Sequence, residues 1–343
     1  MTIYILNYIL LILYMFFFFQ TKNKKIKKAL FIIAVIQLIL IQGMRSPYLG
    51  NDMTFYWFYY NKQLAYSISN LSFSNFEILF KVLTKIISTI TLDKHLYLTI
   101  ISILSTIPIA IVIYKKSKNP ILSLLLFLSF GFYNFNFSGL RQAIAFAIVF
   151  YSFLFIVDRK LIKFIITIIV ASLFHTSALV FIPAYFLFDF KITKLKIILM
   201  IFVDVIIYIF KVPIYGFINS FFYEEYGIVL TNSYLWMIMC LIILMFCLLY
   251  YKRIVSDNKS ILYNLVIIGT AIMLLSPIAN NILRVANYYY MFIILLIPEV
   301  ISYIKSTKNE LLINLITIIF GLSLYIYLLY VDSYNIVPYI FGN

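Results

Sequence analysis

Charged residues are scarce in this 343-residue chain, at 11% of the sequence, whereas apolar residues make up 64% of it. Soluble domains carry about 25% charged residues, so this composition excludes a water-soluble globule. Apolar runs of bilayer-spanning length recur from one end of the chain to the other, and helices are the usual way for such runs to cross lipid. The sequence therefore predicts an all-α, polytopic integral membrane protein, with one transmembrane domain over residues 1–343.

Glycine and cysteine are also rare, and their scarcity excludes several kinds of chemistry. With nine glycines, the chain has no glycine-rich phosphate loop and no Gly-x-Ser-x-Gly elbow, and it has no HExxH or CxxC motif. Two cysteines alone make no metal site, so Cys240 and Cys247 are interpreted as packing residues. We expect the protein to use no metal and no cofactor.

Lysines gather in short clusters between the apolar runs, at residues 21–28, 115–118, 158–163, 191–196, 251–259 and 305–308. Basic loops of this kind face the cytoplasm. Placing all six inside requires an even number of crossings between neighbouring clusters. About twelve spans meet this condition, with both termini outside: 3–19, 29–43, 96–114, 120–137, 141–157, 161–174, 177–188, 197–210, 235–251, 261–276, 288–304 and 311–330.

Two long outer loops follow from this map, residues 44–95 and 211–234. The count depends on residues 75–90, which carry polar side chains on one helical face and apolar side chains on most of the rest; the polar ones are Glu77, Lys81, Thr84, Lys85 and Ser88. The pattern predicts an amphipathic helix on the outer surface or in a re-entrant dip. A thirteenth span is the alternative.

Three of the five arginines, Arg45, Arg141 and Arg284, lie outside the lysine clusters, on the predicted outer side. The rule that basic loops face the cytoplasm does not explain these three arginines. Unlike lysine, arginine offers a planar fork that suits bidentate contact with phosphate or carboxylate. We therefore expect the outer half of the protein to bind an anion.

Each of these arginines belongs to a segment with further polar or aromatic residues. Residues 43–61 add Asp52 and an aromatic run, and residues 276–290 add asparagines and tyrosines, including Tyr288. In residues 134–142, Ser138 can cap the next helix and Arg141 falls in its first turn, where free N–H groups also favour phosphate. Aromatic rings beside Arg and Asn suit a carbohydrate, because sugar rings stack on them.

Two histidines and one acid leave alternatives open. His175 is either an interfacial residue bonded to a backbone carbonyl or a proton acceptor that faces the same cavity as Arg141. His95 is interpreted as a solvated interface residue. Asp204 stands in the middle of an apolar run, where it would suit a proton-coupled transporter or a neutral acid bonded to another helix.

A known family pattern matches these residues. "GLRQAIAFAIVFYS" is followed one hairpin later by "FHTSAL", and the pair resembles the EpsG family of Wzy-type bacterial polysaccharide polymerases. In this sequence the family's Gly-x-Arg-Gln and Phe-His-x-Ser positions are Gly139, Arg141 and Gln142, then His175 and Ser177. "MRSPYLGNDMTFYWFYYN" is similar to another segment of the family, although the usual Gly-Thr-Asp reads Gly-Asn-Asp here.

The resemblance implies an enzyme of the bacterial cell membrane that acts at the outer leaflet. Such enzymes transfer a growing glycan from undecaprenyl diphosphate to the next lipid-linked repeat unit, alongside other polysaccharide export and chain-length proteins and without nucleic acid. The candidate residues are catalytic Arg141, His175 and Asp52, and substrate-binding Arg45, Gln142, Arg284, Ser177 and Tyr288. The alternatives are an O-antigen-ligase-like transferase and a lipid-linked oligosaccharide flippase or secondary transporter.

Overall fold

The computed structural model describes residues 1–65, 76–190, 234–251, 260–276, 280–304 and 306–342, with single positions between 191 and 213. Within these ranges the chain is helical and has no strand; the one β-type pairing found there is an isolated bridge between Arg45 and Phe341. The chain divides into two compact units. The first contains Met1–Leu179 and Ile304–Asn343, and the second contains Val180–Tyr303.

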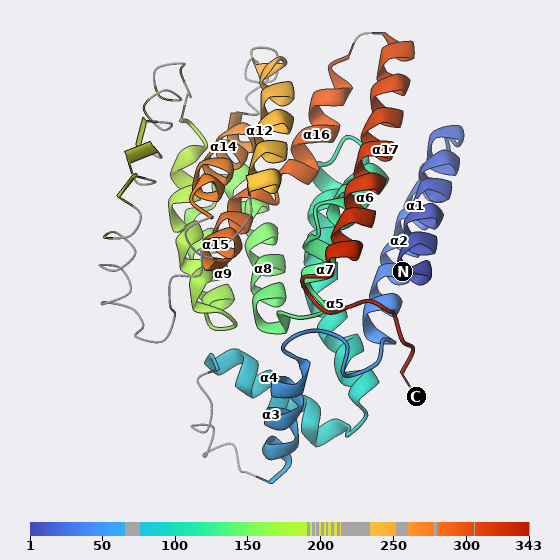
Figure 1. The fold of residues 1–343 in the computed structure, drawn as a ribbon, viewed down its shortest axis with the longest axis vertical. Coiled ribbons are helices and arrows are strands. Elements are labelled where there is room, and N and C mark those ends of the chain that lie inside the picture. The colour runs from blue at the N-terminus through green and yellow to red at the C-terminus, as the bar shows by residue number, and fades with distance from the viewer. Residues whose placement is uncertain are drawn as a thin grey trace. The chain divides into compact units, whose positions relative to one another are not determined.

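The first unit is built on long apolar helices: α1 (Thr2–Gln20), α2 (Lys24–Gly43), α5 (Lys94–Lys116), α8 (Leu140–Val157) and α17 (Thr307–Val331) (Figure 1). Each has at least 18 residues, which at about 1.5 Å per residue approaches the thickness of the hydrocarbon core. α2 packs along α5, and α5 packs along α8. Large apolar side chains remain exposed on the outside of this unit, as they do on a surface that faces lipid. A polytopic helical membrane protein is therefore confirmed.

The predicted span 120–137 is not one helix. It forms α6 (Pro120–Ser129) and the short α7 (Phe132–Phe135), and the chain turns between them at Gly131. Gly131 has a φ of 74°, in the left-handed region that favours glycine because a Cβ is absent. After α7, residues 136–139 form a buried loop at the start of α8.

Six segments of the described chain are long and apolar enough to cross a membrane, namely the five helices of the first unit and Ile282–Ser302 of the second. Shorter apolar helices occupy other predicted spans, among them α9 (Leu161–Ser172) and the 3₁₀ helix η2 (Thr176–Leu187). The total of twelve spans, the single domain and the outside location of both termini stay predictions. Asp204, the predicted span 197–210 and the predicted loop 211–234 lie almost wholly outside the described residues.

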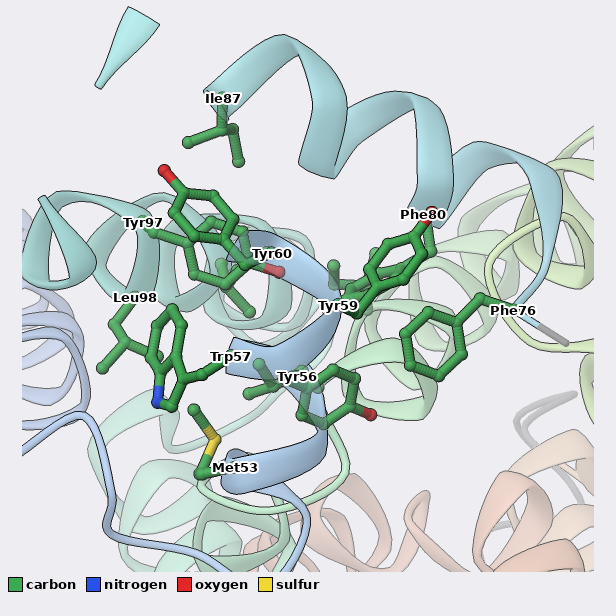
Figure 2. Packing of buried hydrophobic residues seen from close by; sticks show 13 residues of the cluster. Met53, Tyr56, Trp57, Tyr59, Tyr60, Phe76, Phe80, Ile87, Tyr97 and Leu98 are labelled. Atoms are coloured by element: carbon green, nitrogen blue, oxygen red, sulfur yellow. The ribbon is translucent and has the colours of Figure 1, made fainter. Parts of the chain in front are cut away.

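Two helices, α3 (Met53–Ala65) and α4 (Ile78–Ile90), follow α2 at the end of the unit where α5 and α8 begin (Figure 1). They pack on each other and on the first turns of those helices through an aromatic cluster (Figure 2). The cluster has 13 buried members: Met53, Tyr56, Trp57, Tyr59, Tyr60, Phe76, Phe80, Ile87, Tyr97, Leu98, Ile101, Leu140 and Ile144. Aromatic rings of this size contribute much of the packing energy of a small core.

The predicted amphipathic segment is helical from Ile78, but its polar face is not turned wholly to water. Thr84 and Ser88 are buried together with Phe80 and Ile87. The Thr84 hydroxyl is bonded to the hydroxyl of Tyr97 at 3.3 Å, which satisfies it inside the cluster. Its place relative to the membrane stays a prediction.

The C-terminal segment returns to the loop between α2 and α3. Ser46 donates its N–H to the carbonyl of Ile340 at 2.7 Å, and Gly50 donates to the carbonyl of Asn335 at 3.0 Å. Gly50 has a φ of 122°, and a Cβ there would lie 2.3 Å from the carbonyl oxygen of Phe137. The glycine therefore allows three distant segments to meet next to α8.

The second unit contains α12 (Tyr234–Leu248), α14 (Ser260–Leu274), α15 (Asn280–Tyr290) and α16 (Ile293–Ser302). The predicted span 288–304 is divided here, because α15 ends and α16 begins within it. α14 packs closely against α15: a Cβ on Gly269 would lie 2.5 Å from the last backbone nitrogen of α15. Cys240 and Cys247 are buried free thiols on α12, as expected for packing residues.

Candidate functional site

Arg141 lies in the first turn of α8, as the sequence predicts, but the cap of the helix differs from the prediction. The N-cap residue is Gly139, and Ser138 makes no side-chain cap. A Cβ on Gly139 would lie 2.4 Å from the ring of Phe135. The glycine therefore serves close packing of the loop on that ring, and the helix starts one residue later than a Ser138 cap would place it.

The guanidinium of Arg141 is held from three sides. Its Nη1 forms an ion pair with Oε2 of Glu77 at 2.5 Å. The Cζ atom lies 4.2 Å from the centre of the Phe76 ring, close enough for a cation–π contact. The phenol of Tyr56 lies close enough to interact electrostatically with the guanidinium. With 23% of its side chain exposed, Arg141 stays accessible from one direction.

Glu77 connects Arg141 to the turn that carries the candidate histidine. Its second oxygen, Oε1, accepts the backbone N–H of Thr176 at 3.1 Å. Two residues further on, Leu79 donates its N–H to the carbonyl of Leu173 at 2.9 Å. The start of α4 is therefore bonded to both α8 and the turn after α9. The sequence placed Glu77 on a polar helix face but did not identify it as a site residue.

His175 and Ser177 form a pair in this turn. Nδ1 of His175 shares a hydrogen bond with Oγ of Ser177 at 2.7 Å, and both side chains are half-buried. The hydroxyl can fix the imidazole tautomer, which leaves Nε2 for a second partner. The structure thus links the side chain of Arg141, through the carboxylate of Glu77, to the backbone of Thr176, which lies between His175 and Ser177.

Asp52 and Tyr56 approach the same region from α3. The backbone carbonyl of Asp52 accepts the N–H of Tyr56 at 3.1 Å at the start of the helix. Burial raises the pKa of Tyr56, and the nearby Asp52 raises it further. The phenol beside Arg141 is therefore neutral at physiological pH, and the carboxylate that forms an ion pair with Arg141 is that of Glu77.

Arg45 is placed differently from the prediction of a substrate-binding residue. Its side chain is fully buried, with 0% exposed, and the guanidinium donates to the carbonyls of Gln42 at 2.8 Å and Phe137 at 2.7 Å. Burial lowers its pKa to about 10, so Arg45 stays charged at neutral pH. It joins the end of α2 to the loop before α8, and we interpret it as a structural residue.

The other three candidates are less closely tied to Arg141. Gln142 follows it on α8, and its side chain is buried. Arg284 and Tyr288 both lie on α15 of the second unit, where Arg284 is exposed and Tyr288 is fully buried. Their roles stay predictions.

The part of the chain that the structure describes contains no group of three or more His, Cys, Asp and Glu side chains that could hold a metal ion. The groups at the start of α8 and in the adjoining turn are a guanidinium, a carboxylate, an imidazole and a hydroxyl, next to a cluster of tyrosines and phenylalanines. This set can bind an anion, orient a hydroxyl group and accept its proton.

The sequence model of the EpsG family matches residues 28–341, nearly the whole chain. Nothing among the curated proteins or the solved structures matches this sequence. The matched range contains the whole Arg141 site, the second unit and most of the first.

Proposed function

Because the chain belongs to the EpsG family, which is associated with Wzy-type polymerases, we propose that it polymerises lipid-linked oligosaccharide repeat units in the bacterial cell membrane. The donor is a glycan on undecaprenyl diphosphate, and the acceptor is the next lipid-linked unit. The reaction takes place at the outer leaflet. In this topology the lysine clusters face the cytoplasm, and twelve spans place α3 and α4 outside.

One observation carries the proposal. Arg141, His175 and Ser177 come from two separate parts of the chain, and Glu77 is bonded both to Arg141 and to the backbone N–H of Thr176, the residue between the other two. Arg141 is suited to a phosphate oxygen, and the imidazole is suited to a sugar hydroxyl. A transferase that joins a diphosphate donor to a hydroxyl acceptor requires both groups in one place.

The reaction forms one C–O bond and breaks another. The acceptor hydroxyl attacks the anomeric carbon of the donor sugar, and the bond from this carbon to the diphosphate oxygen breaks. His175 takes the proton of the hydroxyl at Nε2, while Ser177 holds the ring through Nδ1. Asp52 orients the acceptor sugar. Negative charge grows on the leaving oxygen, so a guanidinium in place beforehand lowers the barrier.

The remaining candidates have supporting roles in this proposal. Gln142 stabilises the first turn of α8 beside the diphosphate. Arg284 and Tyr288, on α15 of the second unit, keep their predicted substrate-binding roles. Direct displacement by the hydroxyl inverts the anomeric centre.

Deletion of the protein tests this function. We expect the cells to lose long polymer while single repeat units are still displayed on the surface. Units trapped at the inner leaflet would instead indicate a flippase. Normal polymer that fails to reach its final acceptor would indicate a ligase.

A further inference from the structure

The ion pair between Arg141 and Glu77 has a consequence for anion binding. A guanidinium paired with a carboxylate at 2.5 Å is a neutral group, and a neutral group attracts a diphosphate far less than a free cation does. Tyr56, a close polar neighbour of this side chain, adds no charge. A diphosphate that takes up the full charge of Arg141 therefore competes with Glu77 for it.

The same carboxylate also accepts the N–H of Thr176, next to His175 in the chain. Glu77 lies at the N-cap of α4, and one more bond, from Leu79 to Leu173, joins this helix to the turn. When Glu77 leaves Arg141, its bond to Thr176 is lost or rearranged too. Occupation of Arg141 by an anion is thus linked mechanically to the turn that carries His175.

We propose that Glu77 is the resident competitor of the diphosphate at Arg141: the donor displaces it, and its return expels the diphosphate product. This inference rests on the proposed function. In each cycle the leaving undecaprenyl diphosphate has the same head group as the donor, so a site that binds the donor tightly also retains the product. An internal carboxylate solves this problem, because it weakens both complexes and refills the site as the product departs.

The first test measures binding by the full-length protein in lipid nanodiscs, with farnesyl diphosphate as the probe. Glu77→Gln keeps the shape of the side chain and removes its charge. We expect it to bind farnesyl diphosphate about tenfold more tightly than the wild type, which corresponds to about 1.4 kcal/mol. The matched control is Asp158→Asn, which neutralises the exposed ion pair of Asp158 with Lys160 and leaves the affinity unchanged.

The second test measures hydrogen exchange in a peptide that covers residues 173–178. In the wild type, farnesyl diphosphate should increase exchange at the Thr176 amide, since its acceptor moves away. In Glu77→Ala this amide should exchange rapidly with or without the probe. In polymerisation assays, Glu77→Gln should lower both the KM for the donor and kcat, whereas a purely structural role would not lower KM.

The outcomes separate the two proposals. Equal or weaker binding by Glu77→Gln, with clear binding by the wild type, overturns the role of Glu77 and leaves the proposed function standing. An unchanged Thr176 amide on binding also overturns it. If the wild type does not bind farnesyl diphosphate at all, the proposed diphosphate site is wrong, and the role of Glu77 is wrong with it.

Discussion

Arg45 and Arg141 lie at the same end of the first unit, and each guanidinium lies over a phenylalanine ring, at 4.6 Å from Phe137 and 4.2 Å from Phe76. Their polar partners differ. Arg45 is enclosed and donates to backbone carbonyls, whereas Arg141 is partly exposed and is paired with the carboxylate of Glu77. We therefore interpret Arg45 as a structural residue and propose that Arg141 is the arginine that binds a ligand.

The largest effect should follow removal of the enclosed arginine. Arg45→Ala leaves two buried carbonyls without donors and opens a cavity, and each unsatisfied group costs about 1–3 kcal/mol. We expect loss of most folded protein, measured as a decrease in Tm and in the yield of membrane-embedded protein. A stable Arg45→Ala protein with poor diphosphate binding would instead return Arg45 to the substrate site.

The next largest effect is expected at His175, which precedes the Thr176 amide that is bonded to Glu77. His175→Ala should lower polymer formation about a hundredfold at equal protein level, within the range for loss of a general base. His95→Ala is the matched control. His95 lies in the first turn of α5, where its backbone N–H is donated to the capping side chain of Asp93 at 2.7 Å, and loss of its imidazole should change polymer formation by less than about twofold. Equal activity of the two variants would make His175 structural.

A smaller effect is expected when Ser177, the hydrogen-bond partner of the His175 imidazole, is replaced. Ser177→Ala removes the hydroxyl that shares a hydrogen bond with Nδ1 of His175, and a neutral hydrogen bond contributes about 0.5–1.5 kcal/mol. Polymer formation should fall about three- to tenfold, since the ring loses its preferred tautomer. A pH–rate profile identical to that of the wild type would contradict this role.

The smallest perturbation tests on which side of the membrane Arg45 and Arg141 lie. Reporter groups at Asn61 and Lys116 should leave the protein functional and should label from opposite sides, with Asn61 outside. A cytoplasmic signal at Asn61 would remove both arginines from the outer leaflet.

The helices of the first unit could be predicted from the sequence, because apolar runs between lysine clusters mark spans directly. The break at Gly131 could not, since one glycine among apolar residues is also compatible with a continuous helix. The division between α15 and α16 could not be predicted either, since neither glycine nor proline stands between Tyr290 and Ile293. Long-range contacts, rather than local composition, decide where the helices break at both places.

The site was predicted in part. Arg141 and His175 were found from the residue types and the motif, and the structure brings their segments together. The enclosed state of Arg45 depends on a C-terminal segment about 290 positions away in the chain, which no local pattern indicates. Glu77 was missed because an acid on an amphipathic helix usually faces water, and its pairing with Arg141 became visible only when α4 was placed against α8.

The central claim is that the fork of Arg141, and not only its charge, binds the diphosphate. Arg141→Lys keeps the charge and loses the bidentate geometry. A charge-assisted hydrogen bond contributes about 1.5–3 kcal/mol, and about 1.4 kcal/mol corresponds to a tenfold rate. Polymer length and amount, normalised to membrane-embedded protein, should fall about ten- to a hundredfold in Arg141→Lys and further in Arg141→Ala, while Arg159→Lys in the lysine cluster should match the wild type. Near-normal polymer from Arg141→Lys would contradict the account.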